Sequence, residues 1–202
     1  MGADRSLRAI GSRPVEVSEV ERLARSVRAV CACWANEPGL APGVRAGVLR
    51  RLAEDVTAAT ADRPDRLRAL RSILLRSPFT TVAQRWSFLV VEAAARPCLA
   101  GEERVASAAL VAVVLALDGD PGLADPLGLL GSFSVEELRA AVGRVRRSVV
   151  ASDRLGTAAA VRALEQAASC RAADSCRAAD SCPPSSRDHD VVEEAQPDHR
   201  RR

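Results

Sequence analysis

The amino-acid sequence predicts an all-α protein: a compact bundle of about seven helices with a central apolar helix hairpin and a disordered C-terminal tail. Apolar residues recur at three- and four-residue steps along most of the chain, and Pro or Gly separates the helical stretches. No strand-like alternation extends over more than a few residues. A chain of 202 residues, 48% of them hydrophobic, is long enough for one domain with a real core. We expect a basic N-terminal arm over residues 1–14, a helical domain over 15–169 and a low-complexity tail over 170–202.

Three helices are predicted in the first half of the helical domain. The first starts near Ser18, which stands three residues before a Glu at capping-box spacing, and it ends before Pro38. The second begins at Pro42, because proline suits the first position of a helix. Pro64 separates it from a third, shorter helix, which Pro78 ends because a proline disfavours helical backbone in the residue before it.

The fourth and fifth helices are predicted over about 81–96 and 102–117. Both are apolar on more than one side, unlike an amphipathic surface helix, so we expect them to form the buried central hairpin. The longest mainly apolar stretch, Val105 to Leu117, contains one polar residue, Ser107, and is shorter than the roughly 20 residues that a bilayer span needs. It therefore indicates a buried helix.

The second half of the helical domain starts with a Gly-, Pro- and Asp-rich connection over 118–133, which we expect to pack through its leucines with one helical turn. The sixth helix begins at Ser134, which forms a capping-box pattern with Glu137. An Ala-rich seventh helix over about 156–169 ends the folded part.

The tail carries a tandem repeat, Arg-Ala-Ala-Asp-Ser-Cys, at 171–176 and again at 177–182. Six residues turn a helix by 600°, so successive Cys would not share a face. A Cys at every sixth position matches no zinc-site spacing either. We interpret the repeat as low-complexity sequence, and from Pro183 onward we expect disorder.

Composition argues against an enzyme. All 29 basic residues are Arg and no Lys is present, which excludes Schiff-base and P-loop lysines. The two His, His189 and His199, lie in the tail, so the helical domain has no His for a catalytic Ser-His or Cys-His pair. We predict no cofactor and no metal site. A net charge of +3 makes nucleic acid an improbable partner unless basic residues are concentrated in one patch.

The N-terminal sequence is typical of an N-myristoylation signal. Gly2 follows the initiator Met, Ala3 is small, and Ser6 stands at the preferred position. GC-rich coding also favours Gly and Ala, so coincidence is the alternative interpretation. One myristoyl chain binds membranes only marginally, with K of roughly 10⁴ M⁻¹, and a second signal is needed. Arg5, Arg8 and Arg13 could supply part of that signal at an anionic surface, or they form a solvated arm.

Two cysteines of the first helix face different ways. Cys31 shares the apolar face with Trp34, so we expect it in the core, where free Cys is common. Cys33 points away from that face and is the better candidate for a second acyl chain. With no secretory signal, we expect free thiols in a reducing, intracellular setting. Trp34 and Trp86 are predicted core anchors, with an exposed partner contact as the alternative.

The densest basic group of the helical domain is Arg144, Arg146 and Arg147, in the C-terminal half of the sixth helix. Cations are favoured there by the helix dipole, which predicts an ordinary solvated face. The alternative is a contact with phosphate or with an acidic partner.

Gly2, Ala3 and Ser6, the missing Lys and Tyr, and the tandem tail repeat together resemble the small N-myristoylated tegument proteins of GC-rich alphaherpesviruses. This resemblance implies a virion protein between capsid and envelope, held to the cytoplasmic face of host membranes through Gly2.

The first functional hypothesis is a non-enzymatic helical module that docks on cytoplasmic membranes through acylated Gly2 and presents a surface to as yet unidentified proteins. The alternatives are a soluble, cytoplasmic helical interaction protein without lipid, and a nucleic-acid-binding regulator that uses Arg144, Arg146 and Arg147. No convincing helix-turn-helix supports the last of these.

Overall fold

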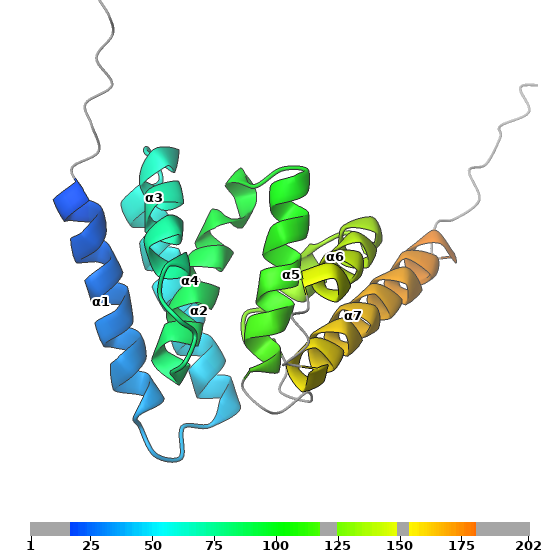
Figure 1. The fold of residues 1–202 in the computed structure, drawn as a ribbon, viewed down its shortest axis with the longest axis horizontal. Coiled ribbons are helices and arrows are strands. Elements are labelled where there is room, and N and C mark those ends of the chain that lie inside the picture. Colours follow the sequence, from blue (N-terminus) through cyan, green and yellow to red (C-terminus); the bar gives the residue numbers. More distant parts are fainter. Residues whose placement is uncertain (1–16, 118–124, 149–153, 181–202) are drawn as a thin grey trace, which may run out of the picture.

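The computed structural model describes residues 17–117, 125–148 and 154–180, and this part of the chain consists of helices and their connections (Figure 1). The predicted all-α fold of seven helices is confirmed. Within the described residues the α-helices are α1 (Val17–Ala35), α2 (Pro42–Thr60), α3 (Pro64–Leu75), α4 (Val82–Ala95), α5 (Glu102–Ala116), α6 (Val135–Ser148) and α7 (Arg154–Asp180), with short 3₁₀ segments η1 (Arg96–Cys98) and η2 (Leu130–Ser132).

Proline sets two of the helix starts, as predicted. Pro42 and Pro64 are the first residues of α2 and α3, where their fixed φ fits the helix and the missing N–H costs nothing. The predicted start of the first helix near Ser18 agrees with α1, whose described part starts at Val17. The side chain of Ser18, and with it the predicted capping box, lies outside the described part of the chain.

Both other predicted capping boxes are formed. At the start of α4, the hydroxyl of Thr81 accepts a hydrogen bond from the backbone N–H of Gln84 at 3.2 Å. At the start of α6, the Ser134 hydroxyl accepts one from the backbone N–H of Glu137 at 3.1 Å. The Glu137 carboxylate in turn accepts from the Ser134 backbone N–H at 2.8 Å. Each box satisfies N–H groups that the first helical turn leaves unpaired.

Helices α1 to α4 form an N-terminal cluster with α4 at its centre. α4 packs against α1, α2 and α3, which surround it in the left half of Figure 1. Trp86 of α4 is 3% exposed, and the Arg45 guanidinium of α2 lies 5.1 Å from its ring centroid, a cation–π contact. Trp86 is thus the core anchor that the sequence predicted, whereas Trp34 packs half-buried at the edge of the same core.

Helices α5, α6 and α7 form a C-terminal cluster, in which each helix packs on the other two. Its largest fully buried side chains include Phe133 at the end of η2, Leu138 of α6 and Leu164 of α7. The connection before α6 packs through Leu129 and Leu130, which are buried, and η2 supplies the expected helical turn. Leu123 lies outside the described residues.

The predicted apolar hairpin of α4 and α5 joins the two clusters. Trp86, Val90 and Val91 of α4 belong to the N-terminal core, whereas Phe88 and Leu89 of the same helix belong to the C-terminal core. α4 is apolar on more than one side because its side chains pack into both cores. α5 packs mainly on α6 and α7, so the hairpin connects two cores instead of filling one.

The seventh helix is longer than predicted. The expected end at residue 169 is wrong, because α7 continues to Asp180 and includes residues 170–180, which we assigned to a low-complexity, disordered tail. Ala and Arg of the repeat are good helix formers, and neither Gly nor Pro interrupts the chain between Gly156 and Pro183. The predicted disorder beyond Pro183 concerns residues outside the described part of the chain.

Candidate functional site

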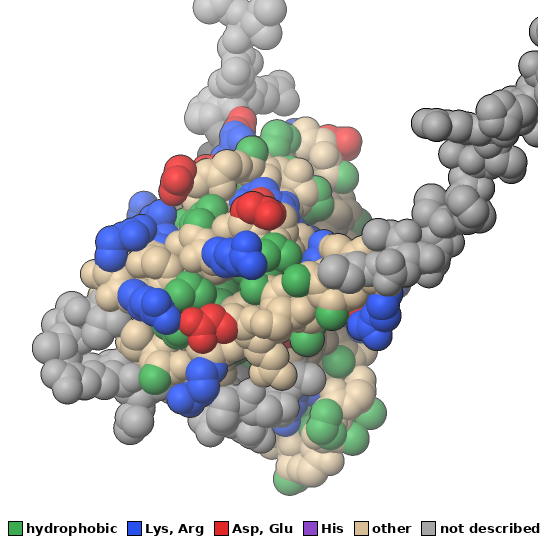
Figure 2. Space-filling model, turned by 90° about the vertical axis from the view of Figure 1, so that its right-hand side faces the viewer, with side chains coloured by type: hydrophobic (Ala, Val, Ile, Leu, Met, Phe, Trp, Pro, Cys, Tyr) green, Lys and Arg blue, Asp and Glu red, His purple; other side chains and the backbone are tan. Residues whose placement is uncertain are grey.

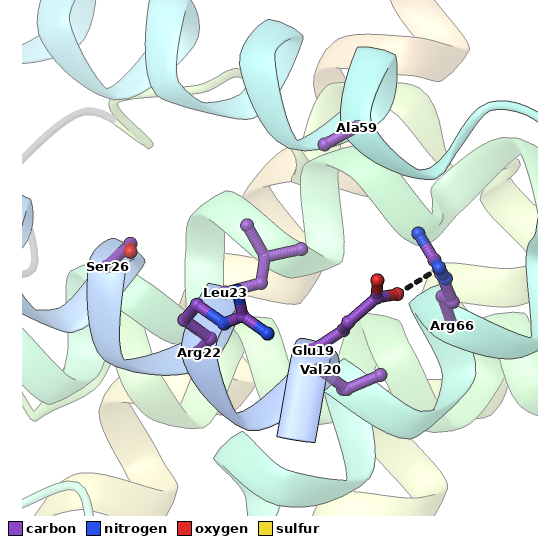
Figure 3. Close-up of a pocket in the computed structure, with 7 residues that line it drawn as sticks. All are labelled: Glu19, Val20, Arg22, Leu23, Ser26, Ala59 and Arg66. Atoms are coloured by element: carbon purple, nitrogen blue, oxygen red, sulfur yellow. Dashed lines mark hydrogen bonds and ion pairs between the residues drawn. The ribbon is translucent and has the colours of Figure 1, made fainter. Parts of the chain in front are cut away.

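A pocket opens at the N-terminal end of α1, where the predicted membrane-binding arm joins the helical domain (Figure 3). It has a volume of about 300 Å³. Five of the residues that line it come from the first half of α1, and α2 and α3 add one residue each: Glu19, Val20, Arg22, Leu23, Ser26, Ala59 and Arg66. The pocket forms because α1 and α2 touch little along their length and leave a space at this end.

An ion pair between Glu19 and Arg66 closes one side of this pocket (Figure 3). Arg66 stands in the first turn of α3, which Pro64 starts, and from there its guanidinium reaches across to α1. The Nε atom of Arg66 is buried and has no hydrogen-bond partner. With Arg22 on its other side, the pocket holds two guanidinium groups against one carboxylate, so it favours anions weakly.

The pocket has no catalytic arrangement among its lining residues. The hydroxyl of Ser26 is its only nucleophile, and Glu19 lies seven residues earlier on the same helix. Seven residues correspond to about 10 Å along a helix, too far for the carboxylate to take the hydroxyl proton. Glu19 is also already paired with Arg66. This pocket is therefore suited to binding and not to acid–base chemistry.

A second polar group is buried where the two clusters meet, and the sequence analysis did not identify it. Glu92 of α4 is 1% exposed; it forms an ion pair with Arg71 of α3 and accepts a hydrogen bond from the Ser107 hydroxyl of α5 at 2.6 Å. Both carboxylate oxygens are thus satisfied, and the group ties three helices together. A single Glu in the apolar stretch of α4 was the signal that could have revealed it, because a buried charge requires a partner.

Most of the predicted lipid-binding residues cannot be placed. Gly2, Arg5, Arg8 and Arg13 lie outside the described residues. Cys33 is exposed on α1, as its position relative to the apolar face predicted. Cys31 is 1% exposed in the N-terminal core, and burial raises the pKa of its thiol to about 11. Of the two thiols, only that of Cys33 is accessible for modification.

The predicted basic group on α6 is largely neutralised by neighbouring helices. Arg144 lies 3.5 Å from Glu102 of α5, and Arg146 lies 2.9 Å from Glu165 of α7. Arg147 is exposed. On the side of the molecule occupied by α7, basic and acidic side chains are interspersed (Figure 2). This arrangement fits an ordinary solvated face better than a surface that binds phosphate.

No protein-family model, curated protein or solved structure matches this chain, so no family assignment follows. Among the described helices, none combines the length and the apolar character of a bilayer-spanning segment. The described residues also contain no group of three or more His, Cys, Asp or Glu side chains that could hold a metal ion.

Proposed function

We propose that this protein is a non-enzymatic helical interaction module held to cytoplasmic membranes by N-myristoylated Gly2, in the manner of an alphaherpesvirus tegument protein. The observation that carries the proposal is the exposed basic face of α1. Arg22 stands on this face nine residues after Arg13, with Arg25 beside it, and neither is ion-paired within the described residues. The positive charge of Arg5, Arg8 and Arg13 therefore continues onto the helical domain.

The acidic residues of α1 compensate this positive charge only in part. Glu19 is engaged by Arg66, and Glu21 is the one exposed carboxylate near Arg25 in the described part of α1. A cation near an anionic membrane surface contributes about 1 kcal/mol. Arg22 and Arg25 thus add to the weak binding of a single acyl chain.

Cys33 suits a second acylation on the same face. It follows Arg22 by 11 residues, three helical turns, so both side chains leave the helix on the same side, about 16 Å apart along the axis. A membrane that contacts Arg22 can also contact Cys33. In this arrangement α1 lies along the membrane, and the rest of the domain faces partner proteins.

The first test is the mass of the N-terminal peptide after expression of the chain in eukaryotic cells, with Gly2→Ala as control. We expect a gain of about 210 Da on Gly2, the acyl group of N-myristoylation, and none in the control. An unmodified or acetylated N-terminus would overturn the proposed membrane anchor. The alternative hypothesis, a helical interaction protein without lipid, would then replace it.

The second test concerns the basic face of α1. We expect Arg22→Glu/Arg25→Glu in the acylated protein to lower its partitioning onto phosphatidylserine vesicles about tenfold. The matched control is Arg139→Glu/Arg162→Glu, which changes the net charge equally on exposed positions of α6 and α7. Equal loss in both variants would show that net charge, and not this face of α1, binds the membrane.

A further inference from the structure

A groove lies where the N-terminal and C-terminal clusters meet, on the flank of α2 that faces away from the Glu19–Arg66 pocket. Its volume is about 500 Å³. Ala59 of α2 lines the first pocket, whereas Thr57, on the opposite side of the same helix, lines this groove. The facing wall is made by Ala93 at the end of α4, by Arg96 and by Leu127. Ala93 and Leu127 pack against both cores, so the groove runs along the seam between the clusters.

The groove carries more positive than negative charge, with two Arg and one Glu among its lining residues. Arg50 and Arg96 line it, and neither guanidinium has an ion pair or hydrogen-bond partner within the described residues. Glu54, its third charged residue, forms an exposed ion pair with Arg51 at 3.5 Å, and Arg51 also lies 3.5 Å from Asp55. Unpaired guanidinium groups at the edge of a groove attract carboxylates and orient them through charge-assisted hydrogen bonds.

The remaining lining residues are small or apolar. They are Ala53, Thr57, Ala58, Ala61, Ala93 and Leu127. The hydroxyl of Thr57 donates to the Ala53 carbonyl at 2.8 Å, so its proton is already used within the helix. Short side chains let another backbone come close, and Ala93 and Leu127 offer an apolar floor for its side chains. The volume accommodates a few side chains, so a longer occupant would lie over the groove.

We infer that this groove is a docking site for an amphipathic helix of a partner protein that carries acidic residues beside its apolar face. Its carboxylates would pair with Arg50 and Arg96, and its apolar side chains would enter between α2 and Leu127. Charge complementarity selects this occupant over a neutral or basic helix. The inference rests on the protein-interaction part of the proposed function and is independent of the lipid anchor.

The test uses the full, unacylated chain as bait for random 16-residue peptides displayed on phage. We expect selected peptides to be rich in Asp and Glu and to carry apolar residues at helical spacing. Their affinity should fall about tenfold or more with Arg50→Glu/Arg96→Glu, which reverses both charges of the groove. Arg139→Glu/Arg162→Glu should leave the affinity within about twofold. Ala58→Trp, which fills the groove without changing charge, should weaken binding similarly if the variant keeps wild-type helicity by circular dichroism.

Three outcomes would overturn the inference. Selection of no peptide, or of peptides without acidic enrichment, would remove the acidic helix as occupant. Peptides that bind wild type and Arg50→Glu/Arg96→Glu equally well would place the binding surface elsewhere. Concentration-dependent dimerisation in sedimentation runs, abolished by Arg50→Glu/Arg96→Glu, would assign the groove to a second copy of this chain. The lipid anchor is judged separately by the mass of the N-terminal peptide, so either proposal can fail alone.

Discussion

The N-terminal cluster (α1–α4) and the C-terminal cluster (α5–α7) use their charged residues differently. Residues 17–98 carry 13 Arg against eight acidic residues, whereas residues 99–180 carry nine Arg against 11 acidic ones. In the C-terminal cluster, Arg104, Arg144 and Arg146 are paired with acidic side chains of neighbouring helices. The excess positive charge therefore belongs to the N-terminal cluster, which also carries the basic face of α1 and most of the groove beside α2.

The clusters differ in net charge and not in the presence of interhelical ion pairs, because the N-terminal cluster also forms the pairs Glu19–Arg66 and Arg71–Glu92. In the C-terminal cluster, ion pairs between helices engage Arg104, Arg144 and Arg146, whereas Arg139, Arg147 and Arg162 are exposed and have no ion pair within the described residues. Where unpaired Arg side chains remain exposed, as on α1 and α2, they contribute little to folding and are available for binding. At the seam, Glu92 couples the two clusters through Arg71 and Ser107.

The largest expected effect comes from removing the charge at the seam. Glu92→Ala leaves Arg71 without its carboxylate and Ser107 without its acceptor in a buried site, so we expect a loss of about 3–5 kcal/mol in the free energy of unfolding. Urea unfolding followed by circular dichroism measures it. Glu92→Gln, which keeps the shape and can still bond Ser107, is the control and should cost less. A loss below about 1 kcal/mol for the Ala variant would mean that the seam does not couple the clusters.

Leu-to-Ala substitutions at the two cores test whether the clusters unfold together. Leu70 of α3 and Leu138 of α6 are both 0% exposed, so each substitution should cost about 2–5 kcal/mol. Both Trp residues lie in the N-terminal cluster, so Trp fluorescence reports on that cluster, while circular dichroism reports on all helices. Because residues of α4 pack into both cores, we expect Leu138→Ala to shift the unfolding midpoint measured by fluorescence and the one measured by circular dichroism equally. A shift seen only by circular dichroism would show that the clusters unfold independently.

A pH dependence is expected from the C-terminal cluster. The Arg104 guanidinium hydrogen-bonds to Glu137 and holds the pKa of that carboxyl below its usual value. A lowered folded-state pKa contributes stability above the unfolded-state pKa of about 4.3, and this contribution is lost as the pH falls through the folded-state value. Glu137→Gln should therefore cost about 1 kcal/mol at pH 7 and progressively less below about pH 4. Urea unfolding of both proteins between pH 3 and pH 7 checks this, and a constant difference would contradict it.

The smallest effect compares glycines inside a helix of each cluster. At Gly47 of α2, an added Cβ would meet nothing within 4 Å, whereas at Gly143 of α6 it would lie 3.2 Å from Nη1 of Arg147. Gly47→Ala should raise the unfolding free energy by about 0.5–1 kcal/mol, because Ala favours helix and restricts the unfolded chain. Gly143→Ala should gain less, because the Arg147 side chain has to shift. Thermal unfolding of the two variants measures both gains in unfolding free energy. Equal gains would mean that the Arg147 side chain moves at no cost.

The sequence located the cysteines of α1 correctly, but it could not show which arginines have partners or share a groove. The positions of Cys31 and Cys33 followed from helical periodicity, because a residue's side of a helix depends only on spacing within that helix. The neutralisation of Arg144 and Arg146 depends on Glu102 and Glu165, which belong to other helices. The groove between Arg50 and Arg96 likewise joins residues 46 positions apart, and no local pattern indicates that they share a cavity.

The sequence by itself determined the all-α class, the proline and capping-box starts of α2, α3, α4 and α6, and the burial of α4. These follow from local backbone chemistry and from apolar periodicity, which act within a few residues of the chain. Only the tertiary structure decided that α4 serves two cores, that Glu92 lies buried between Arg71 and Ser107, and which arginines are left unpaired. Those features depend on which helices pack together, and the free energy of packing comes from contacts between distant segments.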